Sequence, residues 1–335
     1  MDIDVPDQPP RHVSTGRLPT PDEARRTIEA AYEHHRDVHD GTVADYIPAL
    51  AAVDPSLFGV SVVTTAGGIH SVGDALHPFT IQSISKAFVF ALLLDAIGPE
   101  EARQRLGVNS TGLPFDSVMA IELSDARTTN PMVNSGAIAT TSLMPGDTAE
   151  EKWAGIRDGL SAFAGRPLGL DEQVYDSEMA ANAHNGGIAH LMHSYERLWF
   201  DPDEATDVYT RQCSLLVTAQ DLAAMGATLA NGGVNPLTAT RVIAADHCAR
   251  VLAVMMSCGL YERSGEWLYE IGLPGKSGVG GGIVTVSPGK GGLGVFSPPL
   301  DAAGNSVRGC LVTAELSREL GLNLLVSAPH DREDG

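Results

Sequence analysis

The sequence predicts an α/β (α+β) fold in which a mostly antiparallel sheet, flanked by helices, is built from the two ends of the chain. Strand patterns occur at residues 58–74 and 281–297, where β-branched residues surround Gly-Gly and Pro-Gly turns. Between about residues 99 and 261 the patterns are almost entirely helical. A chain of 335 residues is long enough for about two domains. We therefore expect a disordered leader (1–18), a sheet-containing domain (19–98 and 262–328), an inserted all-helical domain (99–261) and a flexible tail (329–335).

Capping boxes predict where several helices begin, because the hydroxyl of a threonine can accept a hydrogen bond from the backbone N–H three residues later. Such pairs are Thr20 with Glu23, Thr148 with Glu151, and Thr218 with Asp221. A helix that follows residue 83 is expected to stop at Gly98. Further helices are expected over 239–259 and 305–321, and a last strand over 322–327.

The charge and hydropathy of the chain exclude several classes of function. The net charge of -20 argues against binding to nucleic acid or to an anionic membrane. The charge is explained equally well by adaptation to high salt and by a biased composition. The longest apolar run, residues 87–94, ends at Asp95 and is too short to cross a bilayer. The acidic, Pro-rich N-terminus does not have the pattern of a secretion signal, so we expect a cytoplasmic protein.

The cysteines and histidines do not have metal-binding spacing. Four cysteines lie in apolar surroundings without a CxxC pair, which predicts reduced core residues. The eleven histidines form no HExxH or similar pattern. We therefore expect no metal and no cofactor. The cysteines are Cys213, Cys248, Cys258 and Cys310.

The first candidate for chemistry is the pair Ser83 and Lys86 in "SISK", directly before an apolar helix. Lysine is rare here, with only four in the chain, so each one is informative. Residues three apart share a helix face, which lets the hydroxyl and the amine meet. Burial and the positive end of the helix both lower the pKa of a lysine. The neutral amine could then take the proton of a nucleophilic serine. An ordinary exposed lysine is the alternative.

A second stretch supports the first. Lys276-Ser277-Gly278 follows a Pro-Gly bend and precedes a Gly-rich strand, as the KTG element does in serine acyl enzymes of the penicillin-binding kind. Such a glycine lets a substrate approach the strand backbone. The third usual element is not evident. Tyr209 could replace it as a proton relay, although a buried structural tyrosine would look the same.

Taken together, eight stretches resemble the serine-dependent glutaminases, whose fold is β-lactamase/transpeptidase-like. The resemblance covers roughly residues 20 to 328. The stretches, with the residue that each one would contribute, are "GTVADYIPAL" (Tyr46), "IQSISKAF" (Ser83, Lys86), "TNPMVNSGAIA" (Asn134), "VYDSEMAANAHN" (Glu178, Asn185), "YTRQCSL" (Tyr209), "CGLYERSGEW" (Tyr261), "GLPGKSGVGGGI" (Lys276, Val279) and "FSPPLDAAGNSVRG", to which we assign no catalytic residue.

The resemblance implies hydrolysis of L-glutamine to L-glutamate and ammonia through a glutamyl-serine ester. Ser83 would attack, with its own N–H and that of Val279 in the oxyanion hole. Tyr261, helped by Lys86, would pass a proton to leaving ammonia. Glu178 would hold the α-ammonium group. The α-carboxylate would be bound by Asn134, Asn185 and a hydroxyl of Tyr46 or Tyr209, and Lys276 would support the site.

The resemblance also implies a homo-oligomer, either a tetramer or a dimer. The chain departs from the family pattern at His184, Ala181 and Asp116, where the family usually has Arg, Thr and Asn. None of the three is assigned to the site. Two other functions remain open: a β-lactamase or transpeptidase on the same fold, and a catalytically silent homologue that senses an amino acid.

Overall fold

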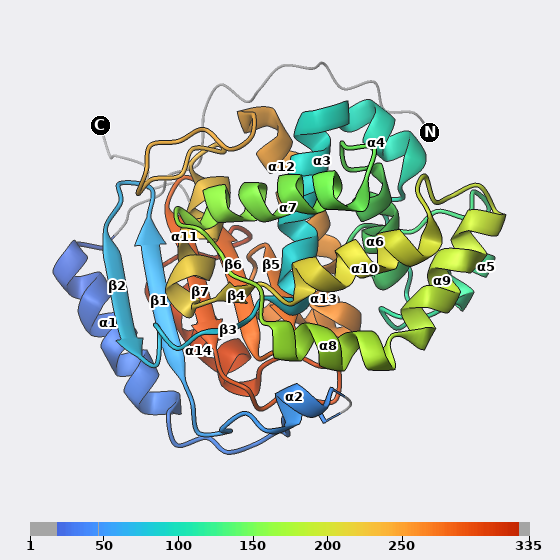
Figure 1. Cartoon of the computed structure of the whole chain (residues 1–335). Helices are drawn as coiled ribbons and strands as arrows, with labels where there is room; N and C mark the ends of the chain where they lie inside the picture. The colour runs from blue at the N-terminus through green and yellow to red at the C-terminus, as the bar shows by residue number, and fades with distance from the viewer. Residues whose placement is uncertain (1–18, 46, 328–335) are drawn as a thin grey trace.

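The computed structural model describes residues 19–45 and 47–327 (Figure 1). Its centre is a five-stranded sheet in which every neighbouring pair is antiparallel, in the order β2-β1-β7-β6-β5. Strands from both ends of the chain therefore share one sheet, as the sequence predicts. The strands are β1 (Gly59–Thr64), β2 (Ile69–Gly73), β5 (Gly275–Gly278), β6 (Gly282–Ser287) and β7 (Gly291–Phe296), and a separate pair is formed by β3 (Phe79–Thr80) and β4 (Leu216–Val217).

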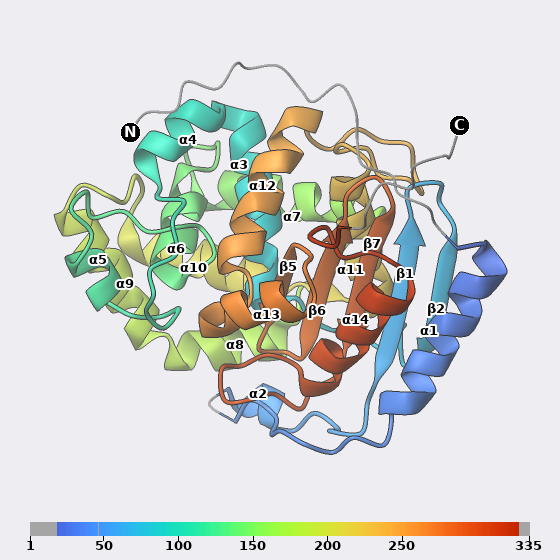
Figure 2. The ribbon, with the colours of Figure 1, turned by 180° about the vertical axis from the view of Figure 1, so that it is seen from behind.

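Helices cover both faces of the sheet. α1 (Pro21–His35) and α14 (Val307–Glu319) pack on one face, which Figure 2 shows toward the viewer. α11 (Ala219–Ala230) lies on the other face, directly over β7. Glycines permit this close approach, because a Cβ added at Gly294 would lie 2.0 Å from the carbonyl oxygen of Ala219.

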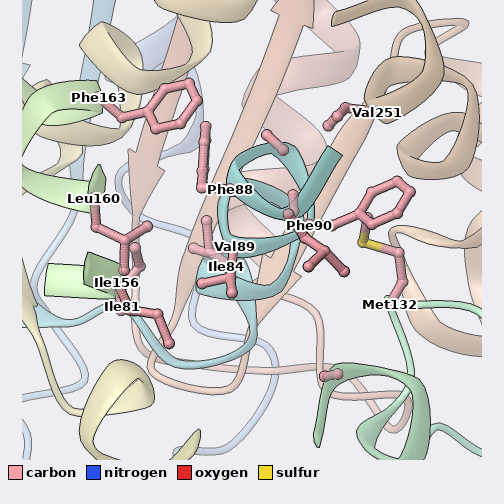
Figure 3. Packing of buried hydrophobic residues seen from close by; sticks show 14 of the residues in the cluster. Ile81, Ile84, Phe88, Val89, Phe90, Met132, Ile156, Leu160, Phe163 and Val251 are labelled. Atoms are coloured by element: carbon pink, nitrogen blue, oxygen red, sulfur yellow. The ribbon is translucent and has the colours of Figure 1, made fainter. Parts of the chain in front are cut away.

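The remaining helices gather beside the β5 edge of the sheet, around α3 (Ser85–Ile97). α3 is apolar on almost all sides and buried along most of its length, as expected for a central helix. Figure 3 shows Phe88 of α3 beside Phe163, with ring centroids 5.0 Å apart. The other helices of this region are α4 (Pro99–Arg105), α5 (Met119–Glu122), α6 (Asn134–Leu143), α7 (Ala149–Ala164), α8 (Glu172–Ala181), α9 (Ala183–Ser194), α10 (Pro202–Cys213), α12 (Ala245–Cys258) and α13 (Ser264–Glu270), with 3-10 turns η1 (Gln82–Ile84) and η2 (Tyr261–Arg263). The short helix α2 (Pro48–Ala51) packs against α8.

Most local predictions are confirmed. The capping boxes at Thr20, Thr148 and Thr218 form as expected, and Gly98 ends α3. The helix expected over 239–259 begins only at Ala245. The backbone before Ala245 is not helical, because the N–H of Val242 donates to the carbonyl of Gly233 at 2.8 Å.

The prediction of a strand over residues 322–327 is wrong. Gly321 has φ +62° and ends α14, and the N–H of Leu322 then donates to Ser317 O at 2.8 Å, which closes the helix. The side chain of Asn323 accepts from the N–H of Leu325 at 2.8 Å. This Asx turn directs the backbone away from strand geometry, although the apolar sequence favours a strand.

The division into two domains stays a prediction, and the leader (1–18) and tail (329–335) fall outside the described residues. No helix among the described residues combines the length and the apolar character needed to span a bilayer. All four cysteines are free thiols, as the sequence predicts.

Candidate functional site

Ser83 lies in the 3-10 turn η1, between β3 and the central helix α3, and its side chain is buried. The residue before it, Gln82, has φ +51°, a left-handed conformation that is strained for a residue other than glycine. Ser85 holds this turn, since its hydroxyl donates to Gln82 O at 2.8 Å. Strain of this kind is typical of functional sites, and here it positions the residue directly before the expected nucleophile.

Lys86 reaches Ser83 from the first turn of α3. Its Nζ donates to Ser83 Oγ at 3.0 Å and to Asn134 Oδ1 at 2.6 Å. The side chain is 1% exposed, and burial lowers the pKa of Lys86 to about 8, although the charges of Asp116 and Glu178 partly oppose this shift. An amine with this pKa is neutral often enough near neutral pH to accept the proton of the serine.

Asn134 connects three helices at this point. It is the first residue of α6, and its Nδ2 donates to Asn185 Oδ1 on α9 at 3.0 Å. The hydroxyl of Tyr209 on α10 donates to Asn134 Oδ1 at 3.3 Å. Asn185 in turn donates to Asn182 Oδ1 at 2.9 Å. These amides and hydroxyls form one connected set of hydrogen-bond donors and acceptors beside Lys86.

Glu178, on α8, is the acidic group of the site. Its Oε2 accepts hydrogen bonds from Gln82 Nε2 and Ser214 Oγ, both at 3.4 Å. Burial raises the pKa of Glu178 to about 7, while these two hydrogen bonds and the charge of Lys86 act in the opposite direction. A cationic ligand group beside it would favour the ionised form.

The end of β5 packs closely against the turn that holds Ser83. A Cβ added at Gly278 would lie 3.0 Å from Ile81 O, and one added at Gly280 would lie 2.9 Å from Thr80 O. Val279, between these glycines, is therefore beside the nucleophile turn. The glycines in "KSGVGGG" permit this contact between backbones, which fits the expected place of the Val279 N–H in an oxyanion hole.

Tyr261 begins the turn η2 and is the second residue of the site with a left-handed backbone, at φ +54°. Its hydroxyl donates to Ser277 O at 3.2 Å, and its ring centroid lies 4.7 Å from that of Phe115. The ammonium nitrogen of Lys276 lies 4.4 Å from the Tyr261 ring centroid and donates to Ser277 O at 2.7 Å. Burial, together with the charge of Lys86, holds the pKa of Lys276 well below its usual value.

One expected residue, Tyr46, lies outside the described residues. Its neighbours in the chain, Ala44 and Ile47, are buried in one apolar cluster with Tyr261 and Val279. Ala44 and Ile47 therefore lie beside the site.

The structure also brings in residues that the sequence did not assign to the site. Phe115 lies over Lys86, with the amine 5.7 Å from its ring centroid, and its carbonyl accepts from the N–H of Asn134 at 2.8 Å. Ser214 contacts Glu178. His184, one of the departures from the family pattern, bonds through Nε2 to Asp116 O at 2.8 Å. This bond joins α9 to the loop that carries Phe115.

A possible metal-binding group among the described residues lies on α1 and α14, away from these side chains. His34 Nδ1 and His35 Nε2 bond to Glu315 Oε2 at 2.9 Å and 2.8 Å. Burial alone would raise the pKa of Glu315, but its bonds to the two imidazoles lower it. The three groups therefore already satisfy one another.

Comparisons with known proteins agree with this geometry. The model of the family described as "Glutaminase" matches residues 41–325. "Glutaminase 2" of Yersinia pestis is 57% identical over 323 residues, which cover 96% of this chain and 95% of the relative.

Solved structures give the same result. One described as a probable glutaminase has a TM-score of 0.91 and 46% identity, covering 92% of this chain and 100% of the other. A second, with a TM-score of 0.79 and 29% identity, covers 90% and 98%. It is a covalent complex between a Bacillus subtilis glutaminase and 5-oxo-L-norleucine, formed by reaction with 6-diazo-5-oxo-L-norleucine.

Proposed function

Because the chain belongs to the serine-dependent glutaminase family, with its β-lactamase-like fold, and hydrolyses L-glutamine to L-glutamate and ammonia, we propose that the reaction passes through a glutamyl ester of Ser83. The observation that carries the proposal is the contact of 3.0 Å between Lys86 Nζ and Ser83 Oγ, in a site where burial lowers the pKa of the amine. A serine is a weak nucleophile until a neighbouring base takes its proton.

In the acylation step, neutral Lys86 takes the proton of Ser83, and Oγ forms a bond to the carbon of the side-chain amide. The carbonyl electrons move to oxygen, where the N–H groups of Ser83 and Val279 stabilise the negative charge. Each such donor typically contributes about 3–4 kcal/mol. The close packing of Gly278 and Gly280 on residues 80–82 supports this arrangement.

Collapse of the intermediate breaks the C–N bond and releases ammonia, which needs a proton. We assign that proton to the hydroxyl of Tyr261. Lys86 then returns a proton to Tyr261, namely the one that it took from Ser83. Lys276 is a positioning residue, because its amine lies against the Tyr261 ring and donates to the same carbonyl of Ser277. Water then attacks the ester with the same base, giving L-glutamate and free Ser83.

Glutamine is a zwitterion, and the site has complementary groups for both of its charges. Glu178 would hold the α-ammonium through a charge-assisted hydrogen bond. The amides of Asn134 and Asn185 and the hydroxyl of Tyr209 would donate to the α-carboxylate, and Tyr46 is assigned to the same group. The raised pKa of Glu178 supports this role, since a cationic substrate would return the buried carboxyl to its charged form.

An active-site label tests the ester mechanism directly. Wild type and Ser83→Ala would be incubated with 6-diazo-5-oxo-L-norleucine, which gave the covalent complex of the B. subtilis relative, and then mapped by peptide mass spectrometry. We expect one label on the wild type, at Ser83, and none on the variant. A label on another residue would overturn the assignment of the nucleophile.

Simple assays distinguish glutamine hydrolysis from the two other functions, a β-lactamase or transpeptidase and a silent sensor. A β-lactamase or transpeptidase would open nitrocefin, and the carboxylate of Glu178 would have no α-ammonium to bind. A silent sensor would bind L-glutamine without releasing ammonia. A coupled ammonia assay with L-glutamine, L-asparagine and D-glutamine separates these functions, and we expect turnover of L-glutamine.

We also propose that the protein acts in the cytoplasm as a dimer or tetramer. The cytoplasmic location is supported by the four free cysteines, because a reducing compartment keeps thiols free. The dimer or tetramer is supported by the family resemblance. Light scattering after size exclusion measures the oligomer, and a monomer at working concentration would contradict the proposal.

A further inference from the structure

A cavity of about 440 Å³ lies on the face of the sheet that α1 and α14 cover. Figure 2 shows these two helices and this face of the sheet. Its volume is in the range of small-molecule sites, which is about 300–1,000 Å³. Its lining residues are different from those that surround Ser83, so it is a separate site. The walls are largely apolar, and the side chains that form most of them are Val62, Leu273, Leu293, Leu316, Leu320 and Leu322.

Three residues of one row across the sheet line this cavity. In the sheet register, Gly291 lies between Ser287 of β6 and Thr64 of β1. All three residues line the cavity. Gly291 packs tightly on β1, because a Cβ added to it would lie 2.4 Å from Val63 O.

Two buried hydroxyl groups have no partner there. Thr285 and Ser287 are 1% and 5% exposed, and both line the cavity. Neither Thr285 Oγ1 nor Ser287 Oγ makes a hydrogen bond among the described residues. A buried hydroxyl without a partner is unfavourable, and valine or alanine would fill the same positions without this cost. A polar group on a ligand would supply the missing partner after a side-chain shift that exposes the two oxygens, which are buried in the free protein.

The charge around the cavity points to an anion. The chain has 42 acidic residues and a net charge of -20, yet none of the described residues that line the cavity is Asp or Glu. It contains His70 and Lys290 instead. Lys290 is one of only four lysines, and the other three are buried. Its N–H donates to Ser287 O at 3.0 Å, so the lysine and one unpaired hydroxyl belong to the same turn.

We propose that this cavity binds a small organic acid with an apolar body of about 8–12 carbon atoms. Its carboxylate accepts hydrogen bonds from Ser287 Oγ, Thr285 Oγ1 and the ammonium of Lys290, which now donates to Gly321 O at 3.0 Å. Its apolar part lies along the leucines of α14 and β7. A general attraction of anions to the surface would not produce this binding, because the protein as a whole repels them.

Decanoate is the probe, titrated into the full-length protein by calorimetry, with thermal melting as a second readout. We expect one site per chain and a melting temperature that rises with decanoate. Lys290→Gln should weaken decanoate at least tenfold while leaving neutral 1-decanol unchanged. Ala24→Phe, which fills the cavity from α1, should remove binding of both.

Matched controls separate this site from the catalytic one. Ser83→Ala should bind decanoate like wild type, and so should Arg318→Gln, which removes an exposed charge from α14 outside the cavity. Thr285→Val should weaken decanoate without lowering the melting temperature of the free protein. The proposal is overturned if 1 mM decanoate gives no heat and no melting shift, if Ala24→Phe binds normally, or if binding appears only after removal of residues 1–18.

Discussion

Two buried lysines, Lys86 and Lys152, hold opposite ends of the same helix. Lys86 donates to Asn134, the first residue of α6, at 2.6 Å. Lys152 donates to the carbonyls of Ser142 and Met144, at the other end of α6, at 3.1 Å and 2.5 Å. The side chains are 1% and 5% exposed, and burial lowers the pKa of each.

The two lysines differ in the atoms that accept their hydrogen bonds. Lys152 supplies donors to carbonyls that a helix C-terminus leaves unpaired, where the helix dipole also favours a cation. Lys86 lies at the N-termini of α3 and α6, where the dipole disfavours a cation, and one of its acceptors is a hydroxyl. A carbonyl has no proton to give, whereas Ser83 Oγ has one. A buried lysine therefore becomes a candidate base because of its acceptor and its helix end, and burial alone does not distinguish it.

Replacing each lysine by arginine should give the largest difference between them. Lys86→Arg should lower kcat/KM for L-glutamine by at least about 1,000-fold, since arginine stays protonated and cannot take the serine proton. Ser83→Ala should be as damaging. Lys152→Arg should change kcat/KM by less than about threefold, because arginine can still donate to carbonyls. The measurement is ammonia release, with circular dichroism to confirm folding.

Normal activity of Lys86→Arg would show that Lys86 only contributes positive charge. Turnover by Ser83→Ala of about a tenth of wild type would rule out the ester mechanism.

The parts of the fold that depend on neighbouring residues were predictable from the sequence. Thr148 finds its partner three residues later, and Gly98 ends α3 through its own backbone. More distant backbone partners contribute to both errors, although the turn signals of Gly321 and Asn323 are local and the apolar pattern of 322–327 concealed them. Val242 bonds to Gly233, which delays α12, and Leu324 bonds to Gly272, which helps to hold 322–327 out of the sheet.

The site follows the same rule. Ser83 and Lys86 are three residues apart, so their contact could be expected from helix geometry. Phe115 and Ser214 reach the site through tertiary packing. Phe115 belongs to none of the eight stretches, and Ser214 lies in "YTRQCSL", where the resemblance points only to Tyr209. The left-handed φ of Gln82 has no signal in the sequence either, because glutamine rarely adopts it.

The carboxylates beside the lysines should also differ in effect. Glu178 opposes the lowered pKa of Lys86, and Asp147 does the same for Lys152. A charge-assisted hydrogen bond to the α-ammonium contributes about 1.5–3 kcal/mol. Glu178→Gln should therefore lower kcat/KM about 10- to 150-fold. Asp147→Asn should leave kcat/KM unchanged.

Glu178→Gln should also lose most of the preference for L-glutamine over an analogue without a free α-amino group. If the variant hydrolyses L-glutamine normally and still rejects that analogue, another group binds the ammonium.

The pH dependence sharpens the comparison further. Activity needs neutral Lys86 and ionised Glu178, with pKa values of about 8 and about 7, and both forms are favoured as pH rises. We expect kcat/KM to rise about tenfold between pH 7 and pH 8. In Glu178→Gln the ionisation with a pKa of about 7 should be missing from the pH profile of kcat/KM. In Lys152→Arg the pH profile should be that of wild type. A kcat/KM that falls over this range would contradict the assignment of Lys86 as the base.

The smallest expected effect concerns stability. Here the replacement of Lys152 should have the larger effect, and the replacement of Lys86 the smaller one. Lys152→Met leaves Ser142 O and Met144 O without their buried donor, which costs about 1–3 kcal/mol. It also removes the contact in which the amine lies 4.7 Å from the Phe200 ring centroid. The melting temperature should therefore fall by a few degrees. Lys86→Met removes a buried amine at a helix N-terminus, and its melting temperature should stay the same or rise, as is common when an active-site residue is replaced. If Lys86→Met melts lower than Lys152→Met, Lys86 contributes more to folding than its helix position implies.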